Sequence, residues 1–227
     1  MGSLIAACAF FIGIHVVISG SPLRGVIAGR IGERAYLALF SLLSVGGMLW
    51  LVYAYSRADG AWLWSTPDSL RWIGPLLLLV ASLFVVVGLT TPSPTVVGGE
   101  KQLDSDQPVQ GVLRITRHPF LWGVALWAAT HLLMNGDAAS LVLFGSLLLL
   151  ALIGPLLIDA KRRRAFGPKW QRFAAATSNV PFAAILSGRN TLHLGEIGVW
   201  RLVAGALVWI ALIVVHPWLF SVPAVPF

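Results

Sequence analysis

The stretch GVLRITRHPFLWGVALWAATHLLMNG, residues 111–136, decides how this chain folds. A basic approach leads into Pro119, whose fixed φ and missing N–H suit the first turn of a helix. About four turns of almost entirely apolar residues follow, until Asn135, Gly136 and Asp137 supply the chemistry of a helix stop and a turn. The stretch therefore predicts a central apolar helix that begins at Pro119 and ends near Asn135.

One polar ring, His131, interrupts the apolar run of this helix. At 3.6 residues per turn, residues four apart share a face, and the face of His131 also carries Gly123, Trp127 and Asn135. An imidazole that faces lipid is costly, so this face is predicted to look into a bundle of helices.

The composition indicates an all-α membrane protein that crosses the bilayer several times. Hydrophobic residues make up 57% of the 227 residues and charged residues only 11%, whereas charged residues are usually about a quarter of a soluble domain. There are 16 Lys and Arg against 9 Asp and Glu, a formal charge of +7. Such an excess fits either nucleic-acid binding or the inner loops of a membrane protein, and its position decides between them. The single Cys8 excludes an intramolecular disulfide and cysteine-rich metal sites.

Apolar segments long enough to cross a membrane predict six spans in one domain, residues 1–227. Besides the central helix, the predicted spans are 2–20, 36–55, 72–90, 139–158 and 197–220. The first segment has the length of a signal peptide, but such peptides begin with basic residues, whereas here Arg24, Arg30 and Arg34 follow the segment. We therefore expect it to be a retained first helix.

Positive charge predicts the orientation of these spans. If the N-terminus lies outside, the inner loops hold nearly all of the Lys and Arg residues. The outer loops then hold only Arg57 and Arg71, with Arg201 just inside the start of the last span. Six spans with both termini outside therefore satisfy the positive-inside rule.

A basic segment between the fifth and sixth spans has the sequence DAKRRRAFGPKWQRFAAATSNVPF, residues 159–182. Its Lys and Arg residues are interleaved with Phe166, Trp170 and Phe173, a pattern typical of a segment that lies on an anionic membrane surface. Nucleic acid can also bind such a mixture, but the position next to a span favours the anionic inner leaflet as the partner. No nucleic-acid partner is expected.

The predicted membrane interior contains histidine and no carboxylate. All nine carboxylates fall in loops or at helix ends: Glu33, Asp59, Asp68, Glu100, Asp104, Asp106, Asp137, Asp159 and Glu196. This distribution argues against carboxylate-driven ion transport and against a di-iron site. His15 and His131, by contrast, are both predicted near mid-membrane, at depths that differ by roughly 5–10 Å.

Two neutral imidazoles at neighbouring depths, flanked by Phe11 and Trp127, can act as axial ligands of a haem. The Fe–N bonds would remove the cost of leaving ring nitrogens in hydrocarbon. The alternative is ordinary hydrogen bonding, for example from His131 to Asn135 or from His15 to Ser19. Two histidines without a fixed spacing are a weak ligand signal, so the residues alone favour ordinary hydrogen bonding, with haem ligation as the alternative.

His118 follows Arg117 at the predicted inner interface. Together with Arg114, these residues could bind an anionic group of a cofactor, or they could simply be a solvated helix start. The sequence favours neither interpretation over the other.

The chain resembles the NnrU family of bacterial inner-membrane proteins over essentially its whole length. The residues that carry the resemblance are HVVISGSPLR (His15 to Arg24), ITRHPFLWGVALWAATHLLMNGD (Ile115 to Asp137) and LIDAKRRRAFGPKWQRFAAATSNVPF (Leu157 to Phe182). This resemblance implies a multi-pass protein of the bacterial inner membrane with periplasmic termini, associated with nitrite and nitric-oxide respiration.

The NnrU family is in turn similar to the membrane ζ-carotene isomerase, which uses a haem b held by histidines. That similarity implies that His15 and His131 are haem ligands and that the chemistry is redox or isomerase chemistry on a small or lipophilic substrate. The isomerase has a cysteine shortly before its central histidine, where this chain has Ala128. A redox partner is not identified by the sequence.

A second resemblance is to the isoprenylcysteine-type membrane methyltransferases. It rests on Arg117-His118-Pro119, Gly123 and Phe166-Gly167, and it implies that Arg117 and His118 help to bind S-adenosylmethionine. That family follows its last long span with a pair of glutamates, whereas this chain has Asp159-Ala160 and then four basic residues. A methyltransferase and a non-catalytic assembly or regulatory protein are therefore the alternative functions.

Overall fold

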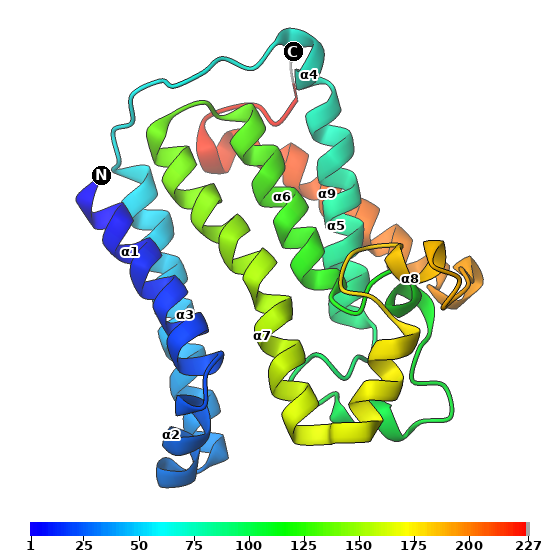
Figure 1. Cartoon of the computed structure of the whole chain (residues 1–227). Helices are drawn as coiled ribbons and strands as arrows, with labels where there is room; N and C mark the ends of the chain where they lie inside the picture. Colours follow the sequence, from blue (N-terminus) through cyan, green and yellow to red (C-terminus); the bar gives the residue numbers. More distant parts are fainter. Residues whose placement is uncertain (226–227) are drawn as a thin grey trace. The chain divides into compact units, whose positions relative to one another are not determined.

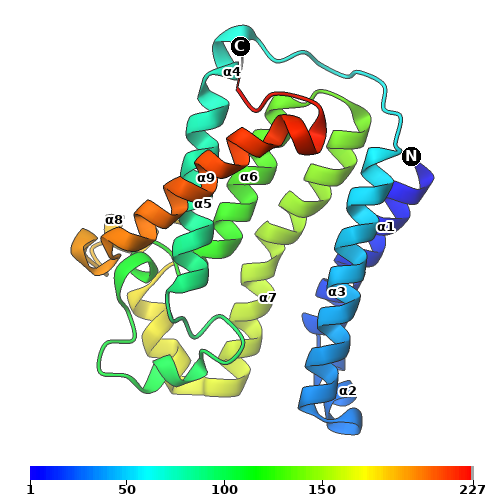
Figure 2. The same cartoon turned by 180° about the vertical axis from the view of Figure 1, so that it is seen from behind.

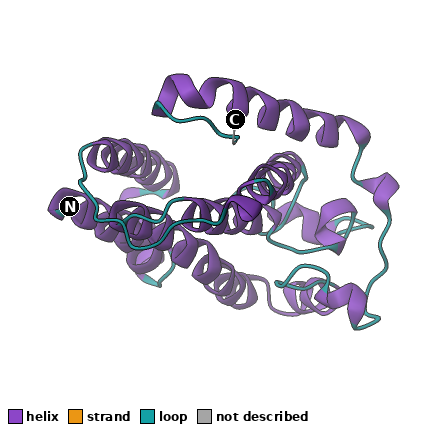
Figure 3. Cartoon of the chain, turned by 90° about the horizontal axis from the view of Figure 1, so that it is seen from above, coloured by secondary structure: helices purple, strands orange, loops and turns teal. Residues whose placement is uncertain are grey.

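The computed structural model describes residues 1–225, and their regular structure is helical. Figure 3 shows helices joined by loops, and the only strand-like pairing in the described part is an isolated bridge between Trp62 and Asp137. The chain forms two compact units. Unit 1 comprises Met1–Pro67 and Ala128–Leu157, and unit 2 comprises Asp68–Trp127 and Ile158–Phe227. The all-α prediction is confirmed.

Unit 1 is built on two neighbouring helices near the N-terminus. Its elements before residue 67 are α1 (Gly2–Gly13), the π-helical turn η1 (Ile14–Ser19), α2 (Leu23–Ile31) and α3 (Glu33–Ser56). α1 and α3 lie side by side (Figure 1). The contact is close because Gly47 of α3 lacks a side chain: a Cβ there would lie 3.1–3.3 Å from the rings of Phe10 and Phe11.

The loop before residue 67 is fastened to the end of α6 (Pro119–Met134). The backbone N–H groups of Leu63 and Trp64 donate to the carbonyl of Gly136, and the Thr66 hydroxyl donates to the carbonyl of Leu133. The bond to Leu133 satisfies a carbonyl group that the helix end leaves without a partner. Together these bonds hold the half of α6 that carries His131.

Unit 2 is built on α5 (Ile73–Thr90), α9 (Val199–Phe220) and the first half of α6. Figure 2 shows α9 crossing α5, and Gly205 allows this contact because a Cβ there would lie 3.1 Å from the Cα of Leu83. The Ser82 hydroxyl donates to the carbonyl of Gly205 across the same contact at 2.8 Å. The shorter elements of the unit are α4 (Asp68–Arg71), η2 (Glu100–Asp104), η3 (Gly111–Arg114), α8 (Ala183–Leu186) and η4 (Leu194–Glu196).

Within the described residues, five helices are long and apolar enough to cross a membrane. They are Gly2–Ser19, Glu33–Ser56, Ile73–Thr90, Ala138–Ala176 and Val199–Phe220. The central helix α6 begins at Pro119 and ends at Met134, as the sequence predicts. Its 16 residues extend only about 24 Å, whereas a bilayer core is about 30 Å thick. The structure therefore shows an all-helical chain with five candidate membrane spans, and the sixth span stays a prediction.

The basic segment is continuous with the fifth predicted span, because α7 runs from Ala138 to Ala176. Its backbone leaves the helical region at Gly167, where φ is 48° and ψ is −121°. The expectation that its aromatic residues lie on a membrane surface is wrong for Trp170 and Phe173, whose exposed fractions are 0% and 2%. Both pack against Leu113 in the interior of unit 2, because burial against apolar protein removes their rings from water as a bilayer would.

The close contact between α5 and α6 gives a stability prediction. In Gly123→Ala, the new Cβ would lie 2.8 Å from the backbone nitrogen of Val85 and 2.9 Å from the carbonyl oxygen of Ala81. Backbone cannot give way easily, so we expect a loss of about 1–3 kcal/mol in the free energy of unfolding. Gly46→Ala is the matched control, since a Cβ there meets nothing within 4 Å. Thermal unfolding in detergent checks the difference, and equal midpoints for both variants would contradict the packing.

Candidate functional site

His15 lies in the π-helical turn η1 and is half-buried in unit 1. Its Nδ1 is 2.8 Å from the backbone carbonyl oxygen of Phe11. Since a carbonyl oxygen can only accept, Nδ1 carries the proton in this bond and Nε2 carries the lone pair. An imidazole held in this way presents Nε2 as a metal ligand, with the carbonyl fixing its tautomer and ring orientation.

Two phenylalanines surround the His15 ring. The ring centroid of Phe11 is 4.4 Å away, and that of Phe40 on α3 is 5.2 Å away in an edge-on arrangement. The sequence predicts Phe11 as a neighbour because it lies one helical turn before His15, but it does not predict Phe40. Phe40 stacks on Tyr36 one turn earlier in α3, and Tyr36 is buried, so the i, i+4 aromatic pair was the available signal.

His131 lies on the half of α6 that belongs to unit 1. Its ring stacks on that of Phe144 in α7, with centroids 4.7 Å apart and an interplanar angle of 29°. The side-chain amide of Asn135 donates to the backbone carbonyl of His131 at 2.9 Å, so this contact between the two residues involves the main chain of the histidine. Trp127, one turn before His131, is the last residue of the α6 half that belongs to unit 2.

A groove of about 460 Å³ lies between residues 5–12 of α1 and residues 141–149 of α7, within unit 1. Its lining is mostly apolar, and the thiol of Cys8 donates to the carbonyl of Val142 across it. Cys8 precedes His15 by seven residues, which is about two helical turns, so both belong to one stripe of the first helix. The groove wall therefore lies on the stripe of α1 that leads to His15.

A second cluster, in unit 2, consists of Arg117, His118 and Asp159. Arg117 pairs with the Asp159 carboxylate through Nε, 2.9 Å from Oδ2 and 3.1 Å from Oδ1, and also through its terminal NH2. His118 Nε2 donates to Oδ1 of the same carboxylate at 2.8 Å, and only 1% of the His118 side chain is exposed. Burial lowers the pKa of His118, which keeps its imidazole uncharged at neutral pH.

The backbone around this cluster is also fixed. The N–H of Arg117 donates to the carbonyl of Ser178, and its carbonyl accepts from the hydroxyl of Thr95. Nearby, Arg114 binds Glu196 with both Nε and NH2, and this guanidinium lowers the pKa of Glu196 to about 2. These contacts favour a structural role for the start of α6, while a cofactor role for Arg117 and His118 stays a prediction.

Asp159 is the member of this cluster that sequence reasoning missed. The sequence groups it only with the carboxylates in loops or at helix ends, yet it is just 9% exposed. The available signal was the neighbourhood of Arg117 and His118 at the same predicted membrane interface, where a buried carboxylate needs cationic partners.

No group of three or more His, Cys, Asp or Glu side chains that could hold a metal ion occurs among residues 1–225. A haem needs only two axial ligands from the protein. Of the predicted ligand-site residues, unit 1 holds His15, His131, Phe11 and Asn135, and unit 2 holds Trp127, Arg117 and His118.

Comparison with known proteins adds two relatives and one family. The family model described as NnrU protein matches residues 3–224. The chloroplastic 15-cis-zeta-carotene isomerase of Arabidopsis thaliana is 30% identical over 183 residues, which are 78% of this chain and 49% of the relative. The enzyme of the same name from Zea mays is 29% identical over 167 residues, or 71% and 45% of the two chains. The chain thus spans about half the length of these curated relatives. No solved structure matches it significantly.

The buried cluster in unit 2 predicts a strong effect of Asp159→Asn. The variant leaves the Arg117 guanidinium buried without its counter-charge, so we expect a loss of about 3–5 kcal/mol in the free energy of unfolding. Asp104→Asn is the matched control, because the Asp104–Lys169 pair is exposed and such pairs contribute only about 0–1 kcal/mol. Unfolding of the purified variants in detergent measures both, and a stable Asp159→Asn protein would show that the cluster is not structural.

Proposed function

Since the chain belongs to the NnrU family, we propose that it is a membrane-embedded isomerase that acts on a cis double bond of a lipophilic, carotene-like polyene. The observation that carries the proposal is the similarity to the two 15-cis-zeta-carotene isomerases over more than two thirds of this chain. In the same proposal, a haem b is held by His15 and His131.

The chemistry of unit 1 suits this reaction. Rotation about a double bond removes no atom and transfers no proton to another molecule, so it needs no general acid or base from the protein. The three carboxylates of unit 1 lie outside or at the ends of its helices: Glu33 begins α3, Asp59 lies in the outer loop, and Asp137 precedes α7. An apolar interior also lets a hydrocarbon substrate enter without loss of polar contacts.

The two histidines fit the proposed haem. His15 has its Nδ1 proton committed to the Phe11 carbonyl, which directs an unprotonated Nε2 away from its own helix turn. His131 is oriented by stacking on Phe144, so each imidazole has an aromatic neighbour that restricts the orientation of its ring. When bound, the haem would supply a redox-active iron that weakens a conjugated double bond, and the protein would supply binding and orientation.

The groove between α1 and α7 supports a lipophilic substrate. Its volume of about 460 Å³ is within the range of small-molecule sites, and it would hold a segment of a long polyene. Because Cys8 in its wall belongs to the stripe of His15, a chain that lies along the groove would run towards that histidine. The link to nitrite and nitric-oxide respiration and the methyltransferase alternative stay predictions of the sequence resemblances.

Absorption spectroscopy of the detergent-purified protein, produced with haem supplied, tests the cofactor. We expect a low-spin, six-coordinate haem spectrum for the native chain and a loss of that spectrum in His15→Ala and in His131→Ala. His216→Ala is the matched control, because the His216 ring contacts the carbonyl of Val222 beyond α9. Retention of the low-spin spectrum in both ligand variants would overturn the assignment of the ligands.

Conversion of 15-cis-ζ-carotene in reconstituted vesicles, followed by chromatography of the isomers, tests the activity separately. We expect the native protein and His216→Ala to convert the substrate and both ligand variants to lose at least about tenfold in rate. A haem-loaded protein that leaves the cis isomer unchanged would contradict the isomerase, whereas conversion by haem-free protein would contradict only the haem.

A further inference from the structure

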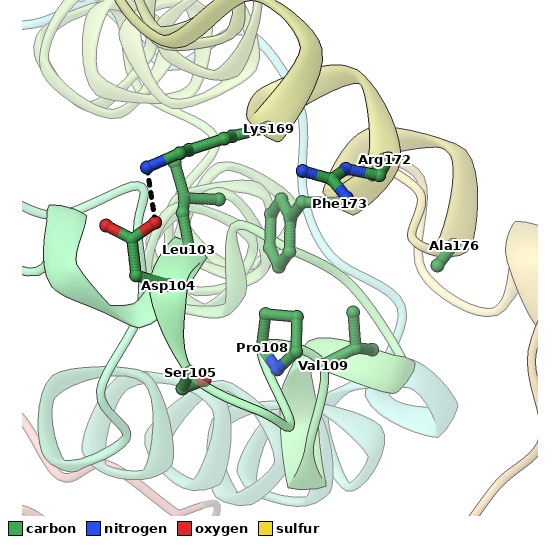
Figure 4. A pocket seen from close by; sticks show the side chains of 9 residues that line it. All are labelled: Leu103, Asp104, Ser105, Pro108, Val109, Lys169, Arg172, Phe173 and Ala176. Carbon is green, nitrogen blue, oxygen red and sulfur yellow. Dashed lines mark hydrogen bonds and ion pairs between the residues drawn. The ribbon is translucent and has the colours of Figure 1, made fainter.

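A pocket of about 370 Å³ lies in unit 2, between the loop that contains η2 and the last turns of α7 (Figure 4). Its wall is apolar at Leu103, Pro108 and Phe173, and its rim carries the cations Lys169 and Arg172. The pocket thus combines hydrocarbon and positive charge, which is the combination that recognises an anionic amphiphile.

The apolar wall is held in place by the core of unit 2. Phe173 is only 2% exposed, and its ring centroid is 5.3 Å from that of Trp170. Trp170 is fully buried and packs with Phe173 and Leu113 in one cluster. A side chain with so little free space keeps its rotamer, so the wall is formed before any ligand binds.

Arg172 supplies a cation that the protein itself does not neutralise. Its guanidinium makes no hydrogen bond or ion pair within residues 1–225, and Figure 4 shows it turned towards the pocket. Lys169 donates to Asp104 at 2.5 Å, but this pair is exposed, with 51% and 61% of the two side chains accessible. An exposed ion pair contributes little, so the Lys169 amine can turn to a bound anion at low cost.

The surrounding segment keeps an excess of positive charge. Seven cations lie between Lys161 and Arg189, and two carboxylates of the preceding loop pair with members of this set: Glu100 with Arg162, and Asp104 with Lys169. α7 is a candidate membrane span that continues into this segment, which would place the pocket at the level of lipid headgroups.

We propose that this pocket binds an anionic phospholipid, with the headgroup phosphate on Arg172 and Lys169 and the start of an acyl chain on Phe173 and Leu103. Arg172 forms a planar, forked donor that suits a phosphate, and Lys169 adds a second charge-assisted hydrogen bond. A free phosphate would use the cations but not the apolar wall, so the pocket favours the lipid. The proposal is independent of the isomerase activity, whose residues lie in unit 1.

Native mass spectrometry of the full-length protein measures retention of phosphatidylglycerol against phosphatidylcholine at equal concentrations. We expect the native chain to prefer phosphatidylglycerol and Arg172→Gln to bind it about tenfold more weakly, since a charge-assisted hydrogen bond to phosphate is lost. Arg163→Gln is the matched control, because it removes the same charge from the same segment without lining the pocket. Equal losses in both variants would overturn the pocket and leave only a general surface attraction.

Asp104→Asn distinguishes binding from a purely structural effect. The variant removes the carboxylate that competes for Lys169, so we expect several-fold tighter retention of phosphatidylglycerol, which an unfolded or damaged protein would not give. Unchanged or weaker retention would contradict the role of Lys169. Inorganic phosphate and glycerol phosphate are added as competitors, and displacement by either at the concentration of the lipid would overturn the acyl contact and the assignment to a phospholipid.

Discussion

The structure depends on one constraint, which is that a charged group or an imidazole in an apolar interior must have a partner. The chain has few charged residues, and the buried ones, Asp159 and Arg162, each form hydrogen bonds with a second side chain. The clearest case is Asp159, which accepts hydrogen bonds from Arg117 and His118 at the start of α6. This cluster ties the start of the central helix to the second half of α7. Close helix contacts at Gly88 and Gly123 then follow along α6. An apolar replacement of all three groups could be as stable, so the cluster specifies where α6 begins more than it adds net stability.

The same constraint shapes the histidines of unit 1. The Nδ1 proton of His15 is satisfied within its own helix, and the ring of His131 rests on Phe144. Neither of these two contacts involves a carboxylate, which agrees with the placement of the three carboxylates of the unit outside its helices or at their ends. The isomerase proposal builds on this feature, because a reaction without proton transfer is one that such an interior can support.

The sequence predicted the helices well because their signals are local. Pro119 marks the start of α6, and unbroken apolar runs locate α3, α5 and α9 to within a few residues. It also placed both histidines on apolar helices. It did not predict that Asp159 is buried, because the partners lie about forty residues earlier in the chain and only their shared place at the predicted membrane interface links them to Asp159. Nor could it predict that Trp170 and Phe173 face protein, since a bilayer surface and a protein core attract the same rings. The break in α7 was equally hidden, because the predicted span ends at residue 158 and Gly167 lies beyond it, within the basic segment.

The segment Ile14–Ser19 forms a π-helical turn, so its number of residues constrains the structure as much as its side chains do. A π turn accommodates one more residue than an α turn, so the residues on either side of it are out of phase with a regular helix. His15 stays on the stripe of Cys8 and Phe11, while a Cβ at Gly20 would lie 2.7 Å from the carbonyl oxygen of Val16 and 2.7 Å from the side chain of Leu157 in α7. Loss of one residue here would rotate everything that follows by about 100°. Homologous chains should therefore vary in residue type across this turn far more readily than they gain or lose a position.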